Sequence, residues 1–183
     1  MPQTPFHALY TARELVACAT EADRLAAAYA SSDIEVYPYQ VAAAMFALCS
    51  PFLKGAVLAD EGSLGKTYEA LLVISQTWFE GKERILIVVP TPLLGQWTQI
   101  MDGCFTVPYI VIDSNERFTE VGGDNPFEQT EIILTTYDFA VQKAENISRV
   151  VWNMVVFEEA HRISNHESKT AIVLDLSENI KFV

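Results

Sequence analysis

The sequence predicts an α/β domain in three layers, with a mainly parallel central sheet and helices on both faces. Several short runs are rich in apolar and β-branched residues, such as RILIVVP (84–90) and TEIILTTY (130–137). Such runs are typical of strands that are buried on both faces. Segments with helical spacing of apolar residues separate them. This alternation indicates βαβ units, whose ligands bind at the carboxyl ends of the strands.

The N-terminal part of the chain is predicted to be helical. Apolar side chains recur at helical spacing over residues 11–31. A second helix, over 40–48, is expected to begin after Pro38, because proline is favoured at helix starts. We therefore expect an N-terminal helical extension over 1–36 and one main domain over 37–183.

The rest of the main domain alternates between strands and helices. A helix over 66–79 is expected to end at Gly81, because glycine readily adopts the left-handed conformation that closes helices. The region 114–130 has no clear element and is expected to be a mobile surface loop. Strands are expected at 55–60, 84–90, 107–113, 130–137 and 152–159, with a further helix over 92–102.

The composition favours one acidic globular domain. The chain has 183 residues, half of them hydrophobic, and a formal net charge of -12. A large basic face for nucleic acid is therefore disfavoured, because phosphate contacts need Lys and Arg. No apolar run is long enough to span a membrane and no secretion signal is evident, so we expect a cytoplasmic protein with no membrane partner. Three cysteines are expected to be reduced and mostly buried: Cys18, Cys49 and Cys104.

The segment VLADEGSLGKT, Val57 to Thr67, has the context of a phosphate-binding loop. It follows an apolar run and opens a helix, so main-chain N–H groups and the positive end of the helix dipole could face an anion. In such a loop Lys66 contacts the β- and γ-phosphates and the Thr67 hydroxyl binds Mg²⁺. The usual pattern has glycine where this chain has Asp60. A helix that merely starts at a glycine is therefore an alternative.

A second signal is VVFEEAH, Val155 to His161. A strand that runs into two carboxylates suits a magnesium nucleotide site, because one acid can hold the metal and the other can orient the attacking water. We assign the metal to Glu158 and the water to Glu159. In the alternative, the two acids only cap the next helix. That alternative explains neither the apolar strand before them nor His161 after them.

Four segments together resemble a known family. LADEGSLGKT, ILIVVPTPLLGQW, IILTTYDFA and VVFEEAH follow one another as in the first motor domain of superfamily 2 nucleic-acid-dependent ATPases. The SWI/SNF-like branch fits best, since its loop has Asp where the usual pattern has glycine. Within it the chain is similar to the bacterial RNA polymerase-associated translocases, including the NPF before the fourth motif. The resemblance runs from about Tyr37 onward and implies a RecA-like fold that uses ATP and Mg²⁺.

The resemblance also implies roles for individual residues. Gln40 corresponds to the glutamine that reads adenine, although a polar residue at a helix start is the simpler interpretation without the family. His161 corresponds to the residue that couples the nucleotide to the partner domain. Trp97 falls near the nucleic acid, but its helical spacing favours a core role equally. The expected contacts with the nucleic-acid backbone are Thr91, Gln96, Thr135 and Thr136.

Two departures from the family pattern bear on activity. Ser63 stands where the family has glycine, with Gly62 one place earlier, and Glu158 stands where the family has Asp. Each could weaken ATP binding or hydrolysis, because the loop backbone and the Mg²⁺ shell both have strict geometries. A degenerate lobe that only binds or supports other parts is therefore an alternative. The expected phosphate site comprises Gly62, Ser63, Leu64, Gly65, Lys66 and Thr67.

The family carries a second RecA-like lobe with an arginine finger, and the resemblance implies that this chain acts with one. We expect ATP hydrolysis coupled to translocation on double-stranded DNA only in a longer protein, with little or no ATPase activity from these residues alone. The implied partners are double-stranded DNA, bound weakly by this lobe, the second lobe, and RNA polymerase. A motor of a restriction or repair enzyme of the same superfamily is an alternative.

Overall fold

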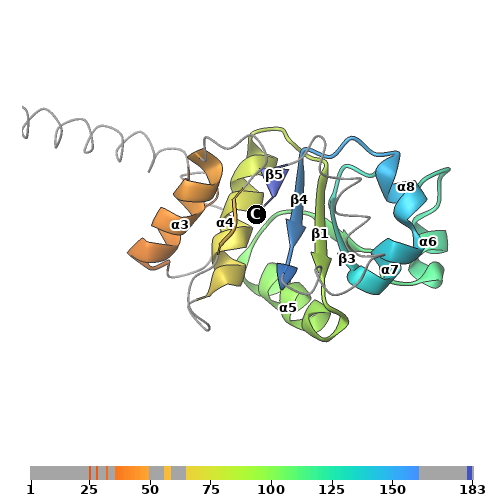
Figure 1. Ribbon diagram of the computed structural model, residues 1–183, viewed down its shortest axis with the longest axis horizontal. Coiled ribbons are helices and arrows are strands. Elements are labelled where there is room, and N and C mark those ends of the chain that lie inside the picture. Colours follow the sequence, from red (N-terminus) through yellow and green to blue (C-terminus); the bar gives the residue numbers. More distant parts are fainter. Residues whose placement is uncertain are drawn as a thin grey trace, which may run out of the picture.

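The structure is a computed structural model that describes residues 25, 28, 32, 36–49, 56–58, 65–160 and 181–182. Within them one parallel sheet carries helices on both faces (Figure 1), which confirms the predicted three-layer α/β fold. The strands are β1 Ile85–Val89, β2 Tyr109–Val111, β3 Ile132–Thr136, β4 Met154–Phe157 and β5 Lys181–Phe182. The helices are α3 Pro38–Cys49, α4 Lys66–Phe79, the 3-10 helix η1 Thr91–Leu93, α5 Leu94–Cys104, α6 Asn115–Val121, α7 Tyr137–Gln142 and α8 Ala144–Ser148.

The sheet has the strand order β2-β3-β1-β4-β5, and every pair is parallel. In the central strand β1, Val88 lies opposite Thr135 of β3 on one side and Phe157 of β4 on the other. Because these strands run in one direction, their carboxyl ends reach the same edge of the sheet. The segments that follow β1, β3 and β4 therefore meet at that edge.

The sheet separates two hydrophobic cores, because successive side chains of a strand point to opposite faces. Ile85, Ile87 and Val89 of β1 belong to the first core, with buried side chains of α3, α4 and α5. Leu86 and Val88 belong to the second, with buried side chains of α7 and α8 and with α6 packed beside them. Figure 1 shows α3 and α4 on one side of the sheet and α6, α7 and α8 on the other.

The two helices ahead of the sheet form where the sequence predicts them. α4 covers residues 66–79, as expected, and Gly81 follows it with φ 79°. α3 includes the helix predicted over 40–48 and packs on α4 (Figure 1). Almost all of the helix predicted over 11–31 lies outside the described residues. Of the strand predicted over 55–60 only 56–58 are described, and these three residues are not part of a strand.

The region 114–130 contains a helix, so the prediction of a mobile loop is wrong. α6 begins after Ser114, whose hydroxyl accepts a main-chain N–H from the first turn at 3.3 Å. Beyond α6, Phe127 is fully buried in the second core. The side-chain amide of Asn125 donates to the carbonyl of Asn146 at 2.8 Å. A capped helix and a buried anchor therefore hold this region against α7 and α8.

The prediction of mostly buried cysteines is wrong for the described part of the chain. Cys49 is exposed and Cys104 is half-buried. Each is the last residue of its helix, α3 or α5, where the helix end meets solvent. Cys18 lies outside the described residues. Among the helices that the structure describes, none combines the length and apolar character that crossing a bilayer would need.

Candidate nucleotide site

Three segments that are distant in sequence meet at the carboxyl edge of the sheet. Glu158 directly follows β4, and its N–H donates to the carbonyl of Val88 at 3.0 Å. Lys66, the first residue of α4, lies close enough for its charge to act on the Glu158 carboxyl. Gln40 of α3 lies against Gly65, the residue before α4. The fold thus brings together the predicted adenine, phosphate and metal residues.

Gly65 provides the turn into α4. Its backbone is left-handed, with φ 86° and ψ 36°, and it occupies the N-cap position of the helix. Lys66 and Thr67 follow in the first turn and are half-buried. The N-terminus of this 14-residue helix favours an anion, because its first N–H groups have no partner within the helix. The other predicted loop residues, Gly62, Ser63 and Leu64, lie outside the described residues.

Gln40 is held in place at the start of α3. Its side chain is 5% exposed, and its Oε1 accepts the main-chain N–H of Tyr37 at 3.0 Å. Its Nε2 is so near Gly65 that a Cβ atom at Gly65 would lie 2.5 Å from it. The side-chain amide therefore sits directly beside the turn that precedes Lys66. This position suits a group that recognises the base while the loop holds the phosphates.

We expect Gly65→Ala to destabilise the chain by about 1–2 kcal/mol, because an L-residue at this φ is strained. The new Cβ would also displace Gln40, so discrimination between ATP and GTP should fall. Gly81→Ala is the matched control, since Gly81 has φ 79° but nothing within 4 Å of an added Cβ. Denaturant unfolding and competitive nucleotide titration measure both effects. Equal nucleotide discrimination in the two variants would contradict the assignment of Gln40.

The two predicted acids differ in their surroundings. Glu158 is half-buried, whereas Glu159 is exposed and has a left-handed backbone with φ 55°. Burial raises the pKa of the Glu158 carboxyl, and the neighbouring Glu159 carboxylate raises this pKa further. The Lys66 ammonium lowers the same pKa. Glu158 is therefore an acid whose charged form needs a nearby cation. His161 lies outside the described residues.

Glu158→Gln should raise the melting temperature of the nucleotide-free chain at pH 7.5. A carboxyl whose pKa is raised in the folded state destabilises that state once it is charged, so its removal is stabilising above that pKa. The gain should vanish below the ordinary glutamate pKa of about 4.3, where the acid is protonated in both states. Glu83→Gln, at an exposed site, is the control and should change little. A lower melting temperature for Glu158→Gln at pH 7.5 would oppose this interpretation.

The oxygen donors at this edge fit Mg²⁺. The Glu158 carboxylate and the Thr67 hydroxyl are hard ligands of the kind this ion prefers. Within 36–49, 56–58 and 65–160, no three His, Cys, Asp or Glu side chains form a group that could hold a metal alone. Mg²⁺ in nucleotide sites commonly uses one or two protein carboxylates and takes its other ligands from phosphates and water.

Two of the predicted nucleic-acid contacts are exposed at the same edge. The buried Pro90 follows β1, and Thr91 comes next as the first residue of η1. Gln96 lies in the first turn of α5. Both side chains are exposed. Trp97, in contrast, is 1% exposed and belongs to the first core. Of the two roles open for Trp97, the structure supports packing.

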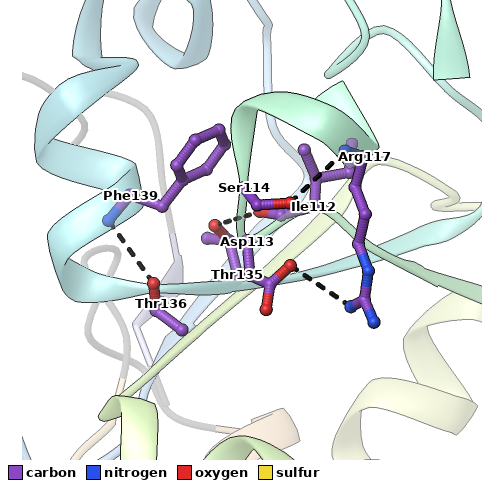
Figure 2. A network of polar contacts seen from close by, with 7 residues as sticks. All are labelled: Ile112, Asp113, Ser114, Arg117, Thr135, Thr136 and Phe139. Carbon is purple, nitrogen blue, oxygen red and sulfur yellow. Dashed lines mark hydrogen bonds and ion pairs between the residues drawn. The ribbon is translucent and has the colours of Figure 1, made fainter. Parts of the chain in front are cut away.

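The other two predicted contacts are buried and bonded within the fold. The Thr135 hydroxyl donates to the carbonyl of Ile112 at 2.6 Å, and its side chain is fully buried (Figure 2). The Thr136 hydroxyl oxygen accepts the N–H of Phe139 at 3.4 Å and caps α7. Because Thr136 uses only its oxygen here, its O–H can still donate. The Thr135 hydroxyl, in contrast, already donates its proton to the carbonyl of Ile112.

Sequence reasoning gave no role to Tyr137, the first residue of α7. Its hydroxyl donates to the main-chain carbonyl of Glu158 at 2.9 Å, and its ring stacks on Phe157 at 6.2 Å between centroids. The one signal in the sequence was its place directly after Thr135 and Thr136. Local patterns do not reveal which distant carbonyl a tyrosine hydroxyl will reach.

The family of the chain follows from comparison with known proteins. A family model described as the SNF2-related domain matches residues 37–181. The chain belongs to this family. This confirms the resemblance to the first motor domain of SWI/SNF-like ATPases that the sequence motifs indicate. The residues of this SNF2-related domain that were singled out from the motifs all lie within the matched range.

Several curated relatives of this SNF2-related domain come from bacteria. RNA polymerase-associated protein RapA of Pseudomonas fluorescens (strain SBW25) is 38% identical over 128 residues, which are 68% of this chain and 13% of the relative. The protein of the same name from Sodalis glossinidius is 37% identical over 118 residues, 61% of this chain and 12% of the relative. The resemblance to RNA polymerase-associated proteins is thus confirmed. The chain spans only about an eighth of the length of these relatives.

A solved structure supports the same fold. The SWI2/SNF2 ATPase core of Sulfolobus solfataricus, determined in complex with double-stranded DNA, matches with a TM-score of 0.71 over 83% of this chain and 32% of that chain. Its sequence identity is 24%. At that identity the likeness concerns the fold alone, and it confirms the RecA-like arrangement.

Proposed function

We propose that this SNF2-related domain is the ATP-binding lobe of a nucleic-acid-dependent ATPase. The observation that carries the proposal is the meeting of Gln40, Lys66 and Glu158 at the carboxyl edge of the sheet. A Mg-ATP site needs a group that recognises the base, a cationic side chain that binds the phosphates and a carboxylate that holds the metal. They come from separate segments of the chain, so their convergence is not a consequence of sequence proximity.

Each residue has a role in this proposal. Lys66 neutralises the β- and γ-phosphates, and its neighbouring loop residues Gly62, Ser63, Leu64 and Gly65 surround them. Thr67 and Glu158 would hold Mg²⁺, which when bound neutralises the phosphate oxygens. Glu159, exposed beside Glu158, orients the attacking water. His161 couples the site to the partner lobe.

Nucleic acid is proposed to bind at the same edge without a basic face. The exposed Thr91 and Gln96 can bond to phosphate oxygens through an uncharged hydroxyl and amide, which gives contact without sequence reading. Thr136 can add an O–H, whereas Thr135 would support this segment from within. Such contacts suit a chain with a net charge of -12. We propose double-stranded DNA as the track and RNA polymerase as a partner, because of the named relatives.

Hydrolysis is proposed to need a second RecA-like lobe, since an arginine finger stabilises the transition state in such motors. The test is ATP hydrolysis by the longer protein, measured with and without double-stranded DNA and RNA polymerase. We expect DNA to stimulate hydrolysis and Glu159→Gln to abolish the stimulation while ATP binding persists. Absence of hydrolysis under every condition would contradict the motor function.

A second candidate is a lobe that binds nucleotide without hydrolysing it. Its support is Glu158, which is one methylene longer than the family's aspartate and has a raised pKa. Either property could disturb the near-octahedral Mg²⁺ shell. Mg-ATP binding without hydrolysis by the longer protein would favour this candidate over the motor.

A further inference from the structure

The main chain at Glu158 is held from two sides. Its N–H donates to the carbonyl of Val88 on β1 at 3.0 Å, and its carbonyl accepts the hydroxyl of Tyr137 at 2.9 Å. The next residue, Glu159, has a left-handed backbone with φ 55°. The two bonds therefore fix the two peptide groups on either side of the Glu158 Cα, and the chain turns immediately after them. The directions of both acids depend on how these two peptide groups are held.

Tyr137 reaches this point from a strand that is not next to β4. β1 lies between β3 and β4 in the sheet, and Tyr137 follows β3 directly. Its side chain is 5% exposed, and its ring stacks on Phe157, the last residue of β4, with 23° between the ring planes. The packing of the ring thus fixes the position of the Tyr137 hydroxyl. Because this side chain has little freedom to move, it is well suited to hold the Glu158 carbonyl in one place.

We propose that Tyr137 is a positioning residue for the acid pair Glu158 and Glu159. The inference rests on the proposed nucleotide function, since it assigns to that site a residue that touches neither nucleotide nor metal. Partners of this kind orient the groups that hold a metal and tune its binding. Tyr137 also follows Thr136, whose hydroxyl caps the helix that Tyr137 begins. The hydrogen bonds therefore connect the segment proposed to meet nucleic acid with the segment proposed to hold Mg²⁺.

The test is Tyr137→Phe, which removes the hydroxyl and keeps the stacked ring. ATP affinity is measured by calorimetry with Mg²⁺ and again with EDTA. We expect Mg-ATP affinity to fall about 10-fold, as for other groups that orient metal ligands, and metal-free ATP affinity to stay unchanged. Tyr109→Phe is the matched control, because it removes a hydroxyl that donates to Asp102 at 2.6 Å on the edge strand β2. It should leave both affinities unchanged.

The outcomes separate this inference from the proposed function. If the wild-type chain binds no Mg-ATP, both are overturned. If it binds Mg-ATP and Tyr137→Phe binds equally well, or loses affinity equally with and without Mg²⁺, only the role of Tyr137 is overturned. If Tyr137→Phe does not fold, hydrogen exchange of the wild-type chain tests the role of Tyr137 instead. Mg-ATP should then protect 137–142 together with 157–160, and protection of 157–160 alone would overturn the inference.

Discussion

Lys66→Ala is expected to lower the affinity for Mg-ATP about 10- to 100-fold. The change removes charge-assisted hydrogen bonds to phosphate, each of which contributes roughly 1.5–3 kcal/mol. It also removes the cation that lowers the pKa of the Glu158 carboxyl, so the charged form of that acid loses a stabilising neighbour. Titration calorimetry of the nucleotide into both proteins measures the difference.

The control for Lys66→Ala is Lys82→Ala. Lys82 lies beyond the far end of α4, is exposed, and pairs with Glu80 at 2.8 Å. Its removal changes the net charge of the chain by the same amount but leaves the candidate site intact. We expect wild-type affinity for this variant. Equal affinities of the Lys66 and Lys82 variants would show that the site lies elsewhere.

Trp97→Ala is expected to cost about 3–5 kcal/mol of unfolding free energy, the range for a large aromatic side chain removed from a core. Trp97 is 1% exposed and packs in the first core, with Met101 one turn further along α5. A loss of this size is a large fraction of the stability of a typical domain. Urea unfolding followed by circular dichroism measures it, because that signal does not depend on the tryptophan itself.

Gln96→Ala provides the matched comparison. Gln96 precedes Trp97 on the same helix but is exposed, so its loss should change stability by no more than about 0.5 kcal/mol. It should instead weaken binding to double-stranded DNA. The opposite pattern, with Trp97→Ala stable and deficient only in DNA binding, would assign Trp97 to the nucleic-acid surface.

The sheet and its flanking helices could be predicted because local patterns dictate them. β1 and β3 are buried along their whole length and rich in β-branched residues, which is typical of covered parallel strands. α4 has a helical pattern that begins at Lys66 and meets a glycine soon after its end. The position of the candidate site could be predicted for the same reason, since Lys66 begins α4 and Glu158 directly follows the apolar strand β4.

α6 could not be predicted, because its stability comes from contacts distant in sequence. It has only seven residues, too few for a clear period and too few to be stable alone. Phe118 packs against Phe127 and Phe139, and the Lys143 ammonium lies 4.2 Å from the centre of the Phe118 ring. These partners are known only once the chain is folded.

The buried hydroxyls at the end of β3 illustrate the same limit. Thr135 and Thr136 stand where the family touches nucleic acid, yet both hydroxyls bond within the fold (Figure 2). The residue that reaches the acid pair from this segment is Tyr137. A motif indicates which segment matters, whereas the side chain that acts depends on its direction and on the neighbours it meets.

The central claim, that Gln40, Lys66 and Glu158 form a Mg-ATP site, is tested most directly by thermal melting of this chain in the presence of Mg-ATP. At about 100 times the dissociation constant the ligand should add ~2.7 kcal/mol of stability. We therefore predict a melting temperature that rises steadily with Mg-ATP concentration and rises less with Mg-GTP. An unchanged melting temperature at millimolar Mg-ATP would contradict the claim.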